Sequence, residues 1–150
     1  MDEIDRKIVI LLAEDSRRAL ADIGGAVGLS ASAVNERIRR LAAAGAIRRF
    51  TVDADPDALG LPGLVFVFLA LAPEADEAAF REFAAAHAGI IECHHVTGSW
   101  SYLIKIRVAG LSEVEAFLGA LKERGFVSRS ETMLALSSPV AGAFVPTDGS

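Results

Sequence analysis

The stretch from Gly28 to Phe50, GLSASAVNERIRRLAAAGAIRRF, constrains the fold of this chain more than any other. It opens with a glycine turn and with Ser30, whose side chain is suited to cap the N-terminus of a helix. Gly45 is a natural helix stop, and residues 47–50 are strand-like. Between these limits one apolar stripe recurs at helical spacing and consists of Val34, Ile38 and Leu41. The stretch therefore predicts an amphipathic helix that is anchored on one side.

The other side of this helix is polar and cationic. At about 100° per residue, the side chains that point away from the stripe are Ser32, Ala33, Glu36, Arg39 and Arg40. Between residues 37 and 49 there are five arginines and no acid. A helix of this kind fits an anionic partner, and double-stranded DNA is the first candidate. The alternative is a solvated face of a helical bundle, where Glu36 and Arg40 would pair at i,i+4.

The net charge of the whole chain is −5, which would disfavour a nucleic-acid partner if the charge were evenly spread. Residues 1–50 carry 9 basic and 7 acidic side chains, giving +2, whereas residues 51–150 carry 6 and 13, giving −7. Binding to phosphates requires a local cationic patch rather than a basic protein. The charge distribution therefore allows the N-terminal part to bind DNA.

Composition indicates a cytoplasmic protein. Cys93 is the only cysteine, so no intrachain disulfide can form and a reducing compartment is expected. Acidic residues stand near the N-terminus, where a signal peptide would need basic ones. The longest apolar run, residues 64–72, is about half the length that a membrane helix requires. We expect no membrane partner.

Two shorter helical patterns precede the arginine-bearing helix. The first begins at Asp2, a suitable N-cap, and carries an apolar stripe of Ile4, Ile8, Leu11 and Leu12. The second runs from about residue 19 to residue 27. It contains Gly24 and Gly25, each of which costs about 1 kcal/mol relative to alanine, so packing must hold this helix in place. Three helices, a glycine turn and a short strand predict a winged helix-turn-helix in residues 1–52.

The pattern changes after residues 53–62, DADPDALGLP, which are typical of a linker. Residues 63–138 alternate between strands and helices in the order βαββαβ, which predicts a ferredoxin-like fold of the α+β class. The expected elements are strands at 64–69, 90–97, 102–108 and 127–136, and helices at 74–87 and after a capping box of Ser112 and Glu115. Residues 139–150 form a C-terminal tail whose last positions we expect to be loose.

The first strand of this second domain is apolar on both faces, from Leu64 to Leu69. Both helices of a ferredoxin-like fold cover one face of the sheet, so the other face needs a partner. Self-association is the simplest solution, and we therefore expect at least a homodimer.

Over almost its whole length the chain resembles the leucine-responsive/asparagine regulator (Lrp/AsnC) family of bacterial and archaeal transcription factors. The resemblance rests on IDRKI at residues 4–8, VGLSASAVNERIRRLAAAGAI at 27–47 and ECHHVTGSWSYLIKIRV at 92–108. It implies a winged DNA-binding head joined to an α/β-sandwich domain for ligand binding and assembly. It also implies dimers that gather into higher even-numbered oligomers, with a small amino acid as effector. We expect no cofactor.

The resemblance also assigns the DNA contacts. It makes residues 30–44 the recognition helix, beginning at Ser30. The side chains that would reach base edges in the major groove are Ser32, Ala33, Asn35 and Glu36. The side chains that would mostly hold phosphates, without reading sequence, are Arg37, Arg39, Arg40, Arg48 and Arg49. Arg37 lies near the apolar edge of the helix and has the alternative role of bracing the fold.

In the family the effector binds at the turn between the second and third strands and faces a neighbouring subunit. Here that turn comprises Val96, Thr97, Gly98, Ser99, Trp100, Ser101 and Tyr102. Its free backbone N–H groups would take a carboxylate, and Trp100 and Tyr102 would wall an apolar side chain. Ser101 stands where the family usually has an aspartate near the amino group of the ligand, so it brings no charge. The alternative is an ordinary hairpin turn with an aromatic side chain on the sheet.

No catalytic or metal site is predicted. His94 and His95 are adjacent on a strand and point to opposite faces, so they cannot hold one metal ion together. Cys93 and His95 share a face, but two ligands do not make a zinc site, and as a nucleophile pair they lack an orienting partner. The remaining alternative is an enzyme that resembles the sirohaem decarboxylases, which share this two-domain plan and use histidine and arginine near the second strand. No arginine follows His95 before the turn, which weighs against this alternative.

Overall fold

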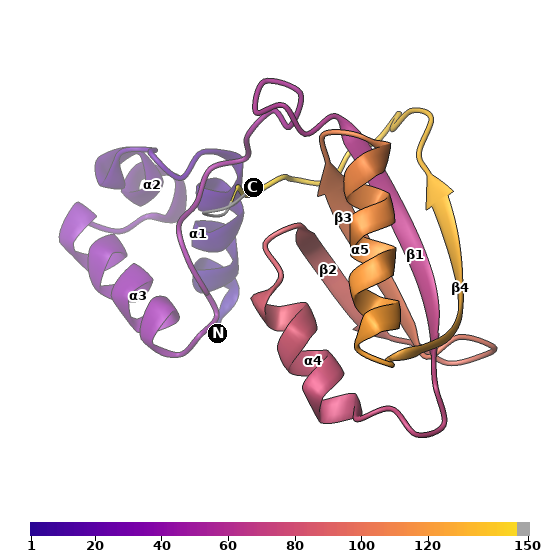
Figure 1. Cartoon of the computed structure of the whole chain (residues 1–150). Helices are drawn as coiled ribbons and strands as arrows, with labels where there is room; N and C mark the ends of the chain where they lie inside the picture. The colour runs from indigo at the N-terminus through magenta and orange to yellow at the C-terminus, as the bar shows by residue number, and fades with distance from the viewer. Residues whose placement is uncertain (147–150) are drawn as a thin grey trace. The chain divides into compact units, whose positions relative to one another are not determined.

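The computed structural model describes residues 1–146, and the chain divides into two compact units, Met1–Thr51 and the remainder from Val52. Within residues 1–146 the first unit has three helices and the second has a sheet and two helices. Figure 1 shows their arrangement within each unit. The loose end expected for the tail falls on residues 147–150, which lie outside the described residues.

The first unit consists of α1 (Glu3–Glu14), α2 (Leu20–Val27) and α3 (Ala31–Ala43). Both predicted N-caps are confirmed. Asp2 Oδ1 accepts the backbone N–H of Asp5 at 2.7 Å, and Ser30 Oγ accepts that of Ala33 at 3.2 Å. The Asp5 carboxylate in turn accepts the N–H of Asp2 at 3.1 Å, which completes a capping box at the start of α1.

A small apolar core holds the three helices together. Its fully buried members come one from each helix and are Ile8, Ile23 and Val34. Gly28 links α2 to α3 with a φ of 73°, a left-handed conformation that glycine adopts without strain. Gly24 is required by close packing, because a Cβ at this position would overlap the carbonyl oxygen of Leu29. The two glycines therefore fix how closely α3 follows α2.

The strand predicted at residues 47–50 does not form. Within residues 1–146 every strand belongs to the second unit, and the segment after α3 is irregular. A strand needs a second strand to satisfy its backbone N–H and C=O groups, and the first unit offers none. Phe50 and Val52 of this segment are accordingly exposed. The helix-turn-helix is thus present in the described chain without its wing.

The second unit is built on one antiparallel sheet with the strand order β2-β3-β1-β4. In chain order its elements are β1 (Gly63–Leu71), α4 (Glu77–Ala86), β2 (Ile90–His95), β3 (Tyr102–Val108), α5 (Leu111–Glu123) and β4 (Val127–Leu134). This order confirms the predicted ferredoxin-like βαββαβ plan. The central strands β1 and β3 pair from Gly63 opposite Val108 to Leu69 opposite Tyr102.

Both helix starts in this unit differ from the predictions. The predicted start of α4 is three residues early, because Asp76 provides its N-cap. The capping box predicted at Ser112 and Glu115 is wrong, since Glu113 accepts the N–H of Gly110 at 2.6 Å and α5 begins directly after that glycine.

No helix within residues 1–146 has the length and apolar character needed to cross a membrane.

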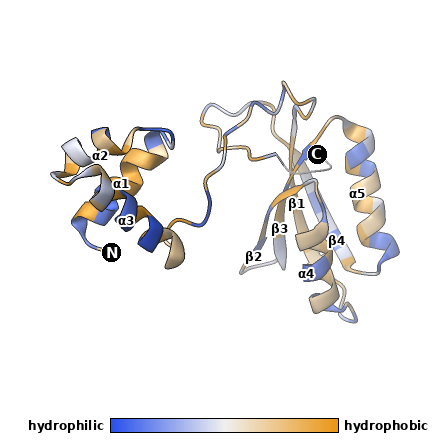
Figure 2. Ribbon diagram, turned by 90° about the vertical axis from the view of Figure 1, so that its left-hand side faces the viewer, coloured by the Kyte–Doolittle hydropathy of each residue, from blue (hydrophilic) through white to orange (hydrophobic). Residues whose placement is uncertain are grey.

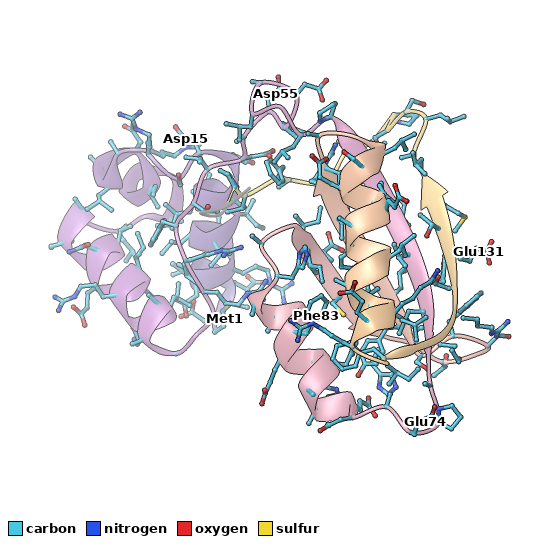
Figure 3. All side chains as sticks on the ribbon, in the orientation of Figure 1. Met1, Asp15, Asp55, Glu74, Phe83 and Glu131 are labelled. Atoms are coloured by element: carbon cyan, nitrogen blue, oxygen red, sulfur yellow. The ribbon has the colours of Figure 1, made fainter. Side chains whose placement is uncertain are left out.

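Both helices cover the same face of the sheet, as predicted, and the largest core lies between them and that face (Figure 2). Alternate strand residues point into this core, and the fully buried ones of β1 are Val65, Val67 and Leu69. Phe80 of α4 contacts the rings of Tyr102 and Phe126, at centroid distances of 4.7 and 5.6 Å. Phe83 extends this aromatic layer between α4 and α5 (Figure 3).

The opposite face of the sheet, the open face, carries no helix of the second unit within residues 52–146. Phe66 and Phe68 of β1 alternate with the buried valines and are partly exposed on this side. The C-terminal tail covers one end of the face and is fixed by Phe144, which is buried. The N–H of Phe144 donates to Asp53 Oδ1 at 2.7 Å, and its carbonyl oxygen accepts the N–H of Ala54 at 2.8 Å. No other segment of residues 52–146 covers the remainder of the open face.

Candidate nucleic-acid interface and ligand turn

The helix α3 is held by its inner side and free on its outer side. Val34 and Leu41 are buried, whereas the polar side chains that are exposed near its start are Ser32, Asn35 and Glu36. Ala33 is half-buried between the two sides. Ser30 Oγ caps the helix and lies 3.1 Å from Ser32 Oγ. The N-terminal half of α3 therefore offers hydroxyl, amide and carboxylate groups to an external partner.

Arg37 does not belong to the cationic side of α3. Its Nη1 lies 2.7 Å from Asp2 Oδ2 and 2.7 Å from Asp5 Oδ1, and Asp5 is buried. The hydrogen bonds from Arg37 lower the pKa of both carboxyls, and the two carboxylates raise the pKa of Arg37. The assignment of Arg37 to a phosphate is therefore corrected. Its guanidinium is committed to the start of α1, so it braces α3 against that helix.

The predicted i,i+4 pair between Glu36 and Arg40 does not form either. The ion partner of Arg40 is Asp5, whose Oδ1 lies 3.6 Å from Arg40 Nη2, and the Arg40 side chain is 62% exposed. A contact of this length, made by an exposed cation to a carboxylate that already serves Arg37, contributes little. Arg40 is therefore available to a phosphate.

Three further arginines are exposed on α3 or just after it: Arg39, Arg48 and Arg49. None of them forms an ion pair with a residue in the described part of the chain. Together with Arg40 they make four exposed cations with no acid between them in the sequence. A cluster of this kind attracts a polyanion, because each phosphate that it neutralises releases bound counterions.

The turn between β2 and β3 is a hairpin that depends on Gly98, whose φ is 103°. Two backbone hydrogen bonds fix it: the N–H of Val96 donates to Ser101 O at 3.0 Å, and the N–H of Ser101 donates to Leu69 O at 2.8 Å. The N–H groups of residues 97–100 have no acceptor among the described residues. Adjacent free N–H groups can bind a carboxylate.

Arg129 of β4 lies beside this turn, although no motif in the sequence connects it with residues 96–102. Its Nη2 donates to the carbonyl oxygen of Ser99 at 2.7 Å, and its guanidinium carbon lies 4.3 Å from the centre of the Trp100 ring. Trp100 in turn packs on Phe68, with ring centroids 5.9 Å apart. Only the strand order could have revealed this residue, because it brings β4 beside β1 and so beside the turn. Arg129 adds a positive charge where a carboxylate would bind.

Ser101 has a structural role that its position in the sequence did not reveal. Its Oγ accepts the backbone N–H of Leu71 at 3.1 Å, at the point where β1 and β4 shift register. This bond satisfies a donor that the irregularity would otherwise leave unpaired. A hydroxyl oxygen has two lone pairs, so Ser101 can still accept a hydrogen bond from a ligand.

Tyr102 faces α4 rather than the outside of the turn. Only 3% of its surface is exposed, and its hydroxyl donates to Glu77 Oε1 at 2.6 Å and accepts from Arg81 Nε at 2.7 Å. Burial, followed by the bond to Glu77, raises the pKa of Tyr102. The expectation that Trp100 and Tyr102 wall one ligand is therefore corrected, since Trp100 packs on Phe68 on the open face.

His94 and His95 point to opposite faces of β2, as predicted. His94 Nε2 lies 3.1 Å from Glu92 Oε2, whereas the His95 ring stacks on Tyr102 with centroids 4.9 Å apart. Burial raises the pKa of the Cys93 thiol, which disfavours the reactive thiolate. Across residues 1–146, no three His, Cys, Asp or Glu side chains are grouped so that they could hold a metal ion.

Known proteins match both units of the chain. Residues 1–42 match the AsnC-type helix-turn-helix domain, and residues 64–143 match the Lrp/AsnC ligand binding domain. The HTH-type transcriptional regulator FL11 of Pyrococcus horikoshii is 34% identical over 139 residues, which cover 92% of this chain and 91% of that protein. The leucine-responsive regulatory protein of Salmonella typhimurium is 38% identical over 122 residues, which cover 79% of this chain and 74% of that protein.

A solved structure has the same fold. The AsnC family transcriptional regulator from Agrobacterium tumefaciens superposes with a TM-score of 0.87 at 28% identity, over 97% of each chain. The Pyrococcus and Agrobacterium proteins are transcriptional regulators by name, the Salmonella protein is a regulatory protein by name, and the two family models match both units of this chain. These matches contradict the alternative of a sirohaem-decarboxylase-like enzyme.

Proposed function

The chain belongs to the Lrp/AsnC family of transcriptional regulators, and we propose that α3 is the helix with which it reads DNA in the cytoplasm. The observation that carries this proposal is the two-sided character of α3, which buries Val34 and Leu41 and exposes polar and cationic side chains. The groups that meet base edges in the major groove are Ser32, Ala33, Asn35 and Glu36. Ser30 contributes at the helix N-terminus, where backbone N–H groups favour a phosphate.

Four arginines position α3 on the DNA by binding phosphates: Arg39, Arg40, Arg48 and Arg49. Their exposure and the lack of strong ion partners among the described residues support this role. Contacts of this kind set affinity and orientation without reading the base sequence. Arg37 acts indirectly, because it holds α3 on the acidic start of α1.

The regulator works as a homodimer that is joined through the open face of the sheet. Three apolar side chains on this face are at least partly exposed: Phe68, Trp100 and Met133, the last of which is 44% exposed. Each apolar side chain of this size that becomes fully buried contributes about 1.5–3 kcal/mol. A two-fold dimer also matches DNA with two half-sites that lie about one turn, or a small multiple of it, apart. Such dimers assemble further into an even-numbered oligomer.

The effector is a small apolar amino acid that binds at residues 96–101, and the naming of one relative as leucine-responsive makes leucine the first candidate. The free N–H groups of the turn and the guanidinium of Arg129 receive its carboxylate. The ring of Trp100 contacts its side chain. Ser101 Oγ accepts a hydrogen bond from its ammonium group without adding charge.

The DNA-reading role is tested by fluorescence anisotropy with the chain's own upstream DNA and with an unrelated duplex of equal length. Ser32→Ala and Asn35→Ala should reduce the preference for the upstream DNA, by about 1–3 kcal/mol for each lost base contact, and leave binding to the unrelated duplex unchanged. Lys122→Ala, an exposed change on α5, is the control. If both variants keep the unchanged protein's ratio of affinities for the two duplexes, α3 is not the helix that reads the DNA.

The effector role is tested by calorimetry with leucine. A charge-assisted hydrogen bond contributes about 1.5–3 kcal/mol and a neutral one about 1, so Ser101→Asp should strengthen binding several-fold to tens-fold. Arg129→Gln should weaken it, because the carboxylate loses its cation. If neither change alters the affinity for leucine or for any other amino acid, the turn does not bind the effector.

A further inference from the structure

A cavity of about 290 Å³ lies under the C-terminal tail, at the far end of β3 from the turn at Gly98. Tail residues 137–144 cover it, and the open face of the sheet forms its floor. Its apolar walls include Leu64, Phe66, Ile91 and Phe144. Two charged side chains line it, both of them cations, namely Lys105 and Arg107. The cavity thus combines apolar surface with positive charge.

Arg107 has no ion-pair partner among residues 1–146. Its Nη1 donates to the carbonyl oxygen of Pro62 at 3.2 Å, and its guanidinium carbon lies 6.0 Å from the centre of the Phe144 ring. Its Nε is buried without an acceptor among the described residues, and no carboxylate in residues 1–146 forms an ion pair with it. A half-buried cation without an anion is unfavourable, so this site calls for an anionic partner.

Three acids line adjoining cavities with Arg107, and each accepts a backbone N–H. Asp53 and Asp55 line one of these cavities, and Glu113, whose Oε2 accepts the N–H of Gly110 at 2.6 Å, lines another. Asp53 Oδ1 accepts the N–H of Phe144 at 2.7 Å, and Asp55 Oδ1 accepts the N–H of Asp57 at 2.9 Å. The second cation of the cavity, Lys105, is also neutralised, because its Nζ lies 2.8 Å from Glu92 Oε1. Arg107 is therefore the group that an incoming anion would meet.

We propose that this cavity binds a small apolar carboxylate, which pairs with Arg107 and lays its hydrocarbon body against the walls under the tail. A guanidinium matches a carboxylate in geometry and charge. A phosphate would have to bury more charged oxygens against apolar walls, which is costly. Ligand pockets usually have volumes of roughly 300–1,000 Å³, and this cavity is just below that range, so its ligand is small.

Binding there would hold the tail closed. Phe144 forms part of the cavity wall and is hydrogen-bonded to residues 53 and 54 of the segment before β1. A ligand that fills the space under the tail therefore also stabilises the pairing of the tail with that segment. This inference is independent of the effector turn, because the two sites share no residue.

Calorimetry on the full chain with 4-methylpentanoate, its neutral amide and inorganic phosphate tests the ligand chemistry. We expect 4-methylpentanoate to bind and the amide to bind at least about tenfold more weakly, because the amide lacks the charge that meets Arg107. Phosphate should not compete. Equal binding of the acid and its amide, competition by phosphate, or no binding of the acid up to about 10 mM would each overturn the proposal.

Variants locate the site. Arg107→Gln should weaken the binding of 4-methylpentanoate at least about tenfold. Arg124 is an exposed arginine over Phe83, and Arg124→Gln should leave this affinity unchanged. Ser101→Asp should also leave it unchanged, which separates this cavity from the leucine site. Undiminished binding to a folded Arg107→Gln protein would refute the assignment. If that variant does not fold, the comparison of 4-methylpentanoate with its amide in the unchanged protein still tests whether binding requires the carboxylate.

Discussion

Replacing each of two adjacent glycines of α2 with alanine tests how the helix-turn-helix is packed. Gly24 and Gly25 both lie inside α2, so alanine at either position should gain up to about 1 kcal/mol of helix propensity. A Cβ on Gly25 would meet no atom within 4 Å. We therefore expect Gly25→Ala to stabilise the first unit by about that amount.

Gly24→Ala has the same gain but a steric cost. Its Cβ would lie closer than 3.0 Å to the carbonyl oxygen of Leu29, a distance that real Cβ atoms essentially never show. Leu29 cannot simply withdraw, because its N–H donates to Gly24 O at 2.9 Å and it directly precedes the N-cap of α3. Overpacking of this kind costs about 1–3 kcal/mol. Since the propensity gain is common to both variants, their stabilities should differ by about that cost.

Hydrogen exchange of the α2 and α3 backbone amides measures this difference in the first unit alone. A difference of about 1–3 kcal/mol corresponds to roughly fivefold to 150-fold faster exchange in Gly24→Ala than in Gly25→Ala. Displacement of Leu29 should also weaken DNA binding by Gly24→Ala, because it moves the start of α3. Equal protection of the amides in the two variants would refute the reasoning about this close contact.

Other consequences of the structure can be measured separately. Phe80→Ala should lower the free energy of unfolding of the second unit by about 3–5 kcal/mol, because Phe80 is fully buried. Urea unfolding monitored by Trp100 fluorescence measures this change. Phe68→Asp should give a monomer in light scattering and Leu111→Asp, on the exposed start of α5, should not; a dimeric Phe68→Asp protein would place the interface elsewhere. Burial lowers the pKa of His87 below its ordinary 6.5, so the unfolded state binds its proton first. The contribution of neutral His87 to the free energy of unfolding should therefore be complete above about pH 6.5 and decrease as the pH drops below that value. The decrease should be smaller in His87→Gln, and an identical pH profile of stability for the two proteins would contradict this role of His87.

Features that depend on neighbouring residues in the sequence are predictable here. The caps at Asp2 and Ser30 and the order βαββαβ were predicted correctly, because each signal lies within a few residues of the element that it controls. The strand at residues 47–50 was not, since a strand also needs a partner that the first unit does not supply. The predicted capping box of α5 was wrong, because two nearby acids, Glu113 and Glu115, are both candidates to accept the N-cap N–H and the structure uses Glu113.

The candidate sites show the same division. Helical spacing put Arg37 near the apolar edge of its helix and so allowed a bracing role, but it could not identify the partners Asp2 and Asp5, which lie more than thirty residues away in the chain. Helical spacing identified the exposed side of α3, because periodicity depends only on the helix itself. By contrast, Arg129 reaches the turn only through the strand order of the sheet. Contacts between distant segments are thus what the sequence could not supply.

The salt dependence of DNA binding tests the central claim most directly, which is that the arginines on and after α3 bind phosphates. Each phosphate contact contributes about 0.9 to the slope of log affinity against log salt concentration, so an Arg40→Ala and Arg48→Ala double variant should lose about 1.8 of that slope. A Lys122→Ala and Arg124→Ala double variant removes the same charge from the second unit and should keep the full slope. An unchanged slope in the folded Arg40→Ala and Arg48→Ala protein would contradict the account.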